Sequence, residues 1–202
     1  MEFADVVRRR RMVRNYDPDR PVPAEIRERI LANALHAPSA GFSQGWAFLV
    51  IEGDDLARYW RSAAGDEPYD DWLRGIASAP LLIIAFAHKD GYLDRYAEPD
   101  KGWTDRDESR WSAPYWFIDT GMAALLMLQT AVDEGLGACF FGVPADRVQA
   151  VREEFGVPDG YAPIGVVSVG YPQPDRRSPS LERGRREVPE VVHRGRWGIH
   201  EQ

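Results

Sequence analysis

The sequence PLLIIAFA, residues 80–87, is a nearly continuous run of apolar side chains. A strand that has one face in water alternates apolar and polar residues, and this run does not alternate. The pattern therefore predicts a strand that is buried on both faces, and the rest of the chain has to supply the two layers that cover it.

Strands and helices are predicted to alternate on both sides of this run. Short apolar stretches between glycine or proline breaks predict three further strands, at residues 46–52, 138–143 and 164–170. Apolar residues at helical spacing predict helices at residues 3–11, 23–37, 54–63, 69–77 and 144–155. Four strands interleaved with helices indicate an α+β fold.

Residues 115–134 carry the strongest helix signal in the chain. Pro114 stands at its start, Gly135 follows its end, and apolar residues occur nearly all the way around it. A helix that is apolar on all sides is typical of a buried, central position.

Two segments lack such a pattern. Residues 88–113 are dense in charge and contain four large aromatic side chains, and they are predicted to be irregular, as a lid or substrate-facing loop. The alternative is a solvated insertion whose aromatic side chains simply pack down. Residues 171–202 are rich in proline and charge and predict an extended tail, which would wrap a second subunit.

Length and composition limit the class of protein. At 202 residues the chain fits one domain, residues 1–202, because domains average about 150 residues. A net charge of −7 argues against a nucleic-acid partner, and the single cysteine excludes a disulfide framework. No stretch reaches the roughly 18 apolar residues of a membrane span, and no signal peptide is evident at the N-terminus. We therefore expect a cytoplasmic protein without a membrane partner.

Arginine is concentrated at two places. Residues 8–14 hold five arginines in seven positions, and residues 183–186 hold three more. Guanidinium groups repel one another unless an anion lies among them, and their planar donor sets suit phosphate oxygens. The alternative is a solvated surface or ion pairs to the many carboxylates of the chain.

Two other stretches could approach a planar ligand. Residues 37–46, APSAGFSQGW, combine small and hydroxylated residues between a helix and a strand. Residues 134–142 end in Gly142, where the main chain can come close to a ring system. Cys139 within this stretch is predicted to be a buried small hydrophobe rather than a nucleophile. Each stretch could also be an ordinary connection.

Taken together and in order, these stretches resemble the nitroreductase family of flavoproteins. The resemblance covers nearly the whole chain, and its order is more specific than any one motif. It is carried by the segments Arg10–Tyr16 with Pro21–Pro23, Ala37–Trp46, Gly135–Gly137, Gly165–Pro172, and Glu190–His193 with Arg196 and Trp197.

The resemblance implies a mostly antiparallel sheet flanked by helices, in an intertwined homodimer with FMN at the interface. By position, Arg10, Arg11, Met12 and Arg14 would hold the FMN phosphate, completed by Arg185 and Arg186. Other residues would surround the flavin ring: Pro38, Ser39 and Ala40 from the partner subunit, Gln44, and the main chain at Phe141 and Gly142.

Two residues depart from the family pattern. Met12 stands where a serine is usual, which removes a hydroxyl donor to the phosphate, and Phe42 replaces an asparagine near the flavin or substrate. The substrate would meet Phe42 and an apolar roof of aromatic residues, Tyr92, Tyr96, Trp103 and Trp111.

The sequence shows no catalytic triad, no metal-ligand cluster and no paired acid and base, and its four histidines are scattered. Chemistry carried by a cofactor agrees with this pattern. The leading hypothesis is an enzyme that passes a hydride from NAD(P)H through flavin N5 to an electron-poor small molecule, such as a nitroaromatic or a quinone, with ping-pong kinetics. The alternatives are a flavin-dependent dehydrogenase or reductase of a specific metabolite, and a flavin- or deazaflavin-binding protein without turnover.

Overall fold

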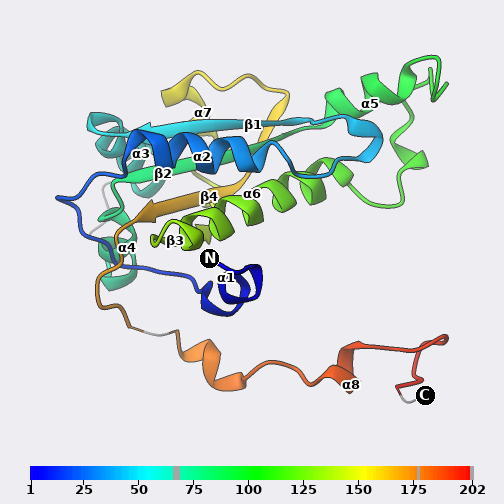
Figure 1. The fold of residues 1–202 in the computed structure, drawn as a ribbon. Helices are drawn as coiled ribbons and strands as arrows, with labels where there is room; N and C mark the ends of the chain where they lie inside the picture. Colours follow the sequence, from blue (N-terminus) through cyan, green and yellow to red (C-terminus); the bar gives the residue numbers. More distant parts are fainter. Residues whose placement is uncertain (66–68, 177, 201–202) are drawn as a thin grey trace.

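The computed structural model describes residues 1–65, 69–176 and 178–200. Its centre is an antiparallel four-stranded sheet in the order β1-β2-β4-β3 (Figure 1). The strands are β1 (Trp46–Glu52), β2 (Leu81–His88), β3 (Gly137–Phe141) and β4 (Tyr161–Gly170). The predicted α+β class is therefore confirmed, and the strand predicted from residues 80–87 is an inner strand of the sheet.

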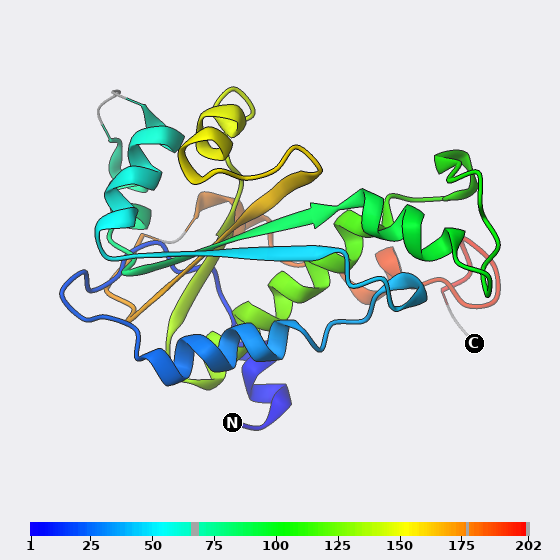
Figure 2. The ribbon, with the colours of Figure 1, turned by 90° about the horizontal axis from the view of Figure 1, so that it is seen from above.

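β2 shows why its sequence does not alternate. Leu81 and Ile83 face one apolar cluster, while Leu82 and Ile84 face a second cluster on the other side of the sheet. Figure 2 shows helices on both sides of the strands. The first cluster contains residues of α2 (Ala24–Ala34) and α6 (Tyr115–Asp133), and the second those of α3 (Asp54–Ala64), α4 (Asp71–Ala77) and α7 (Val148–Phe155).

α6 is the long helix that the sequence predicts, and Pro114 precedes its first residue. Ala123, Met127 and Ala131 on its inner side are completely buried. Its other side is different, because Phe117, Ile118 and Leu125 are 42–44% exposed. The helix is thus central to the fold but keeps an apolar surface that this chain alone does not cover.

The prediction of an irregular segment at residues 88–113 is wrong for its first part. Residues Lys89–Ala97 form helix α5, and a short 3-10 turn, η2, follows at Glu108–Arg110.

Beyond β4 the chain forms only two short elements, η3 (Pro179–Arg183) and α8 (Val188–Val191), among the residues that the structure describes. This tail leaves the end of β4 and runs below the body of the fold, apart from it (Figure 1). None of the helices within the described residues is long and apolar enough to cross a bilayer.

The segment after α1 (Phe3–Arg9) joins the sheet edge and the start of the tail. Met12 forms a parallel bridge with Ala138 of β3, and the Val13 N–H donates to the Ala138 carbonyl at 2.9 Å. Tyr16 then forms an antiparallel bridge with Pro172. The N-terminal segment and the start of the tail therefore meet beside β3, where the candidate site lies.

Candidate functional site

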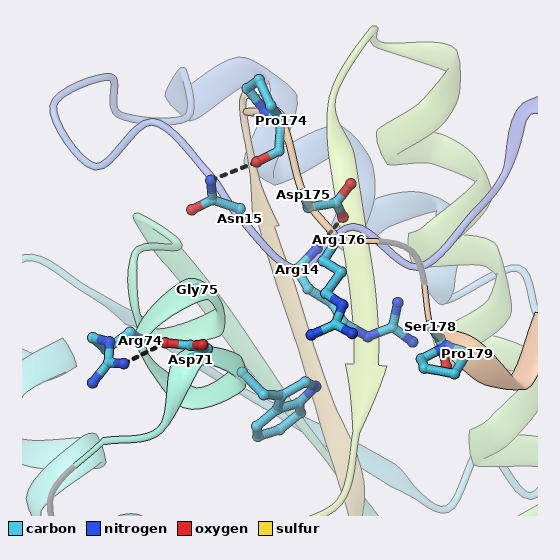
Figure 3. Close-up of a pocket in the computed structure, with 11 residues that line it drawn as sticks. Arg14, Asn15, Asp71, Arg74, Gly75, Pro174, Asp175, Arg176, Ser178 and Pro179 are labelled. Carbon is cyan, nitrogen blue, oxygen red and sulfur yellow. Dashed lines mark hydrogen bonds and ion pairs between the residues drawn. The ribbon is translucent and has the colours of Figure 1, made fainter.

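A pocket of about 670 Å³ lies where the N-terminal segment, α4 and the start of the tail meet (Figure 3). Arg14 enters it from the N-terminal segment, Trp72 from α4, and Arg176 from the tail. It is also lined by Asn15, Asp71, Arg74, Gly75, Pro174, Asp175, Ser178 and Pro179. Its size is within the range of small-molecule sites.

Backbone pairing holds the N-terminal segment and the tail together at this pocket. The Gln173 N–H donates to the Asn15 carbonyl at 3.0 Å, and the Asn15 side-chain amide donates to the Pro174 carbonyl at 2.9 Å. On the other side of the N-terminal segment, helix α4 packs closely against Arg14. A Cβ on Gly75 would lie 2.2 Å from the Arg14 carbonyl oxygen. Only glycine permits this approach.

The carboxylates of the pocket are already engaged. Asp175, whose side chain is nearly buried, accepts from the Arg11 guanidinium at 2.7 Å and from the Arg14 main-chain N–H at 2.9 Å. Asp71 forms an ion pair with Arg74. The side chains of Arg14 and Arg176 form no ion pair with any residue that the structure describes. Their positive charge is available to an anion such as a phosphate.

A second pocket, of about 490 Å³, shares Trp72 with the first. It includes Phe141 and Gly142 at the end of β3, and Trp60 is stacked on Phe141 with ring centroids 5.9 Å apart and planes 11° apart. Trp72 meets Phe141 edge-on, at 86°. The space where a Gly142 Cβ would lie is open. Aromatic walls beside an open main chain suit a flat ring.

The predicted arginines are distributed differently from the expectation. Arg14 lines the first pocket, but Arg10 does not, and Arg11 lines a separate, smaller pocket and is paired with Asp175. Met12 turns toward β3, where its sulfur accepts from the Phe140 N–H at 3.3 Å. This contact gives the methionine a structural role, and its contact with a phosphate stays a prediction.

The tail arginines also differ from the expectation. Arg185 and Arg186 lie in the exposed tail, and Arg186 donates to the Glu190 carbonyl within the same tail. Neither lines the pocket that holds Arg14. Arg176 is the tail arginine that lines this pocket, and the contact of Arg185 and Arg186 with the FMN phosphate stays a prediction.

The loop with Pro38, Ser39, Ala40 and Gln44 lies elsewhere in the chain. It includes the 3-10 turn η1 (Ala40–Phe42) and precedes β1, beside α5 and at the end of the sheet away from α4 (Figure 2). Within one chain, these residues line neither of the two pockets. This separation agrees with the implied position of Pro38, Ser39 and Ala40 in the site of a partner subunit, which stays a prediction.

Tyr92 is not a substrate-facing residue in this structure, which corrects the expectation. Its side chain is completely buried, and its hydroxyl donates to Asp119 at 2.8 Å. Burial and the bond to Asp119 raise the pKa of this phenol above its usual value. Tyr92 lies inward because it is on the face of α5 that packs on the body of the fold.

The other three aromatic residues of the segment pack on one another. The ring centroid of Tyr96 lies 4.4 Å from that of Trp111 and 4.9 Å from that of Trp103, and all three side chains are partly buried. In the single chain they form a packed cluster, as the alternative interpretation expected. Their contact with a substrate stays a prediction, as does that of Phe42, which is 74% exposed.

Sequence reasoning missed Trp72, Arg74 and Arg176, which line the first pocket. None belongs to a motif, and only a fold that brings α4 and the start of the tail together places them there. Cys139 is buried, as predicted, and burial raises the pKa of its thiol. This shift lowers the thiolate fraction and agrees with a packing role.

Comparison with known proteins gives consistent matches along the chain. The model of the "Nitroreductase family" matches residues 7–171. A protein of Archaeoglobus fulgidus named "Putative NADH dehydrogenase/NAD(P)H nitroreductase" is 30% identical over 200 residues, which cover 97% of this chain and 99% of that protein.

Solved structures agree. A nitroreductase family protein from Clostridium difficile is 25% identical, with a TM-score of 0.70 and coverage of 97% of this chain and 99% of that one. A "putative nitroreductase in complex with FMN" from Exiguobacterium sibiricum is 21% identical, with a TM-score of 0.66 and coverage of 93% and 98%.

Proposed function

The chain belongs to the nitroreductase family and has its fold, and on that premise we propose that it is an FMN-dependent oxidoreductase. In this proposal it passes a hydride from NAD(P)H to an electron-poor acceptor, such as a nitroaromatic or a quinone. The observation that carries the proposal is the pocket in which Arg14 and Arg176, from opposite ends of the chain, lie beside Trp72.

The residues of the two pockets fit the parts of FMN. Arg14 and Arg176 carry charge without a carboxylate partner among the described residues, which suits the phosphate group. Trp72 and Phe141 supply apolar walls for the ring, and the space where a Gly142 Cβ would lie is open, so a ring can approach the main chain there. The FMN-bound relative from Exiguobacterium sibiricum adds support for this cofactor.

Bound FMN supplies the redox chemistry, because it can accept a hydride from a reduced nicotinamide and return it to a second molecule. The chain contributes binding, orientation and exclusion of water. The aromatic walls keep water from one side of the ring site, and the arginines hold the phosphate end of FMN. No histidine among the described residues lines either pocket, so we propose that solvent supplies the protons. One site that serves donor and acceptor in turn gives ping-pong kinetics.

We further propose that the active form is a homodimer in which residues 38–44 of one copy complete the ring site of the other. The loop is at the wrong end of the sheet to reach its own pocket (Figure 2). A second copy would supply what one chain does not.

The absorbance spectrum of the purified protein tests the cofactor, and anaerobic titration with NADH and NADPH tests the donor. We expect a flavin spectrum that either nucleotide bleaches, followed by recovery on addition of a quinone. Flavin that neither nucleotide reduces would favour a binding protein without turnover. Bleaching by one specific metabolite alone would favour a metabolite-specific enzyme.

Removal of Arg14 and Arg176 tests the anion site. Each charge-assisted bond to a phosphate contributes about 1.5–3 kcal/mol, so each single change to alanine should weaken FMN binding roughly 10- to 150-fold. Fluorescence titration of the apoprotein with FMN measures this loss. Arg194→Ala is the matched control, because Arg194 is an exposed tail arginine that does not line the pocket and is not among the residues predicted to hold the phosphate. Arg185→Ala is a separate variant: loss of FMN in this variant, with FMN kept in the Arg14 and Arg176 variants, would place the tail ligand at Arg185.

A further inference from the structure

The loop before β1 has an unusual backbone. Gly41, Phe42 and Gln44 have φ angles of 61°, 55° and 49°, in the left-handed region. This region is unfavourable for a residue that carries a Cβ, and two of the three residues are not glycine. Strain of this kind persists only where the surrounding structure imposes it, and it is concentrated at functional sites.

The buried carboxylate of Asp119, on α6, fixes the start of this loop. One oxygen of Asp119 accepts from the Ala40 main-chain N–H at 2.8 Å and from the Tyr92 hydroxyl at 2.8 Å. Asp119 is only 2% exposed and Tyr92 is completely buried. Hydrogen bonds to an ionised acceptor away from water are strong, so this pair holds the start of the turn firmly.

Helix α5 holds the same loop from the side. The Arg95 guanidinium donates to the Gly41 carbonyl at 2.9 Å. The Tyr96 ring covers Gly41 so closely that a Cβ there would lie 2.6 Å from it, and Tyr92 covers Gly45 with a corresponding distance of 2.5 Å. The segment predicted as a lid therefore acts, within one chain, as a support for this loop.

The supported loop presents its side chains outward. Phe42 is 74% exposed, and Gln44 is also exposed. Within the loop, the Ser39 hydroxyl accepts from the Gln44 N–H at 3.0 Å, which fixes the turn between them. A strained turn that displays a phenyl ring to solvent gives its own chain little stability, which argues that the loop is shaped for another surface.

We propose that Asp119 is a positioning residue that acts through Ala40 and Tyr92. It holds residues 39–44 in the observed turn, in which Gly41, Phe42 and Gln44 are left-handed, and this is the conformation in which they complete the ring site of a second copy. The proposal rests on the proposed function. It assigns a role to a buried carboxylate and a buried phenol that are not in contact with the pocket.

The variants Asp119→Asn and Tyr92→Phe test this role with little change in size. In Asp119→Asn, a neutral amide oxygen replaces the carboxylate and is a weaker acceptor for the two donors. Tyr92→Phe removes one donor while it keeps the ring against Gly45. Thr120→Val is the matched control, because Thr120 is equally buried on the same helix but bonds only to the Trp116 carbonyl.

Two measurements are made on each full-length variant. Hydrogen exchange of the peptide that spans residues 39–45 reports the loop directly and needs no flavin. We expect exchange to rise at least tenfold in Asp119→Asn and less in Tyr92→Phe, with no change in Thr120→Val. Fluorescence titration of each apoprotein with FMN should show the same order, with affinity reduced about tenfold in Asp119→Asn.

The outcomes separate the two proposals. Unchanged loop exchange in both variants would overturn the positioning role, as would faster exchange with unchanged FMN affinity. A wild-type chain that binds no FMN would contradict the proposed function and, with it, the role of Asp119 in FMN binding. The exchange data would still show whether Asp119 holds the loop. If Asp119→Asn does not fold, Tyr92→Phe gives the same readouts.

Discussion

Phe42 combines an exposed side chain with an unfavourable backbone conformation. The phenyl ring is 74% exposed and contributes little to the core, while the φ of 55° disfavours any residue with a Cβ. The two effects can be separated, because alanine removes the ring and keeps the Cβ, whereas glycine removes both.

We therefore expect Phe42→Gly to be more stable than Phe42→Ala. A left-handed residue with a Cβ costs about 1–2 kcal/mol, and the greater freedom of glycine in the unfolded chain offsets roughly 0.5–1 kcal/mol of that. The net difference is up to about 1.5 kcal/mol, which corresponds to a rise in Tm of up to about 3–6 °C for a chain of this size. Thermal unfolding measures it. A more stable alanine variant would show that residue 42 does not adopt the left-handed conformation in solution.

Met12 shows how one residue can depart from a family pattern without loss of the local structure. Its sulfur accepts from the Phe140 N–H at 3.3 Å, on the edge of β3. Residue 12 also forms the bridge with Ala138, and Arg14 lines the pocket two residues later.

At the scale of elements, the contact between β3 and the N-terminal segment decides where Arg14 lies. A Cβ on Gly137 would come within 2.8 and 2.9 Å of the two Val13 methyl groups. We expect Gly137→Ala to lower the free energy of unfolding by about 1–3 kcal/mol, because overpacking forces the neighbouring backbone to shift. Denaturant unfolding measures this loss.

Val13→Ala supplies the control, since it removes the two methyl groups that the new Cβ would meet. The double variant should lose less stability than the sum of the two single losses, which is the sign of direct contact. Additive losses would show that Gly137 and Val13 do not touch.

The sequence predicts elements well where burial alone decides them. β2 and α6 are recognisable because almost every position of β2, and the whole inner side of α6, faces other protein. α5 is not, because many of its side chains are charged and Gly91 interrupts it, and only Tyr92 and Leu93 are fully buried. Its helical form depends on packing against the loop before β1, which no local pattern reveals.

Local motifs and long-range packing also decide which site residues the sequence reveals. Arg14 belongs to a local motif and is identified from the sequence, whereas Trp72 and Arg176 reach the pocket only through the packing of α4 and the tail. The sequence predicts Tyr92 as a substrate-facing residue because an aromatic side chain in a charged segment carries no sign of which way it faces. Its bond to Asp119 joins residues 27 positions apart in the chain.

At the scale of the whole molecule, one chain leaves much apolar surface uncovered. Phe117, Ile118 and Leu125 are exposed on α6, and Leu181, Val188 and Trp197 are exposed along the tail. An extended tail that carries apolar side chains away from its own core gains little from folding alone. A second copy with the same two surfaces can cover both at once, since a symmetric pair exchanges identical contacts.

Leu125→Glu should therefore convert the proposed homodimer into a monomer. The side chain is 44% exposed in the single chain, so the fold itself tolerates a charge there, but an unpaired carboxylate buried between two copies is strongly unfavourable. Leu35→Glu is the control, because Leu35 is also exposed but directly follows α2 and does not lie on α6. Sedimentation equilibrium measures the mass, and the absorbance spectrum measures the flavin.

The monomer should also lose FMN, because residues 38–44 then have no second copy to complete. A monomeric Leu125→Glu protein with its full flavin content would place the whole binding site within one chain, and an unchanged dimer would show that α6 does not form the interface.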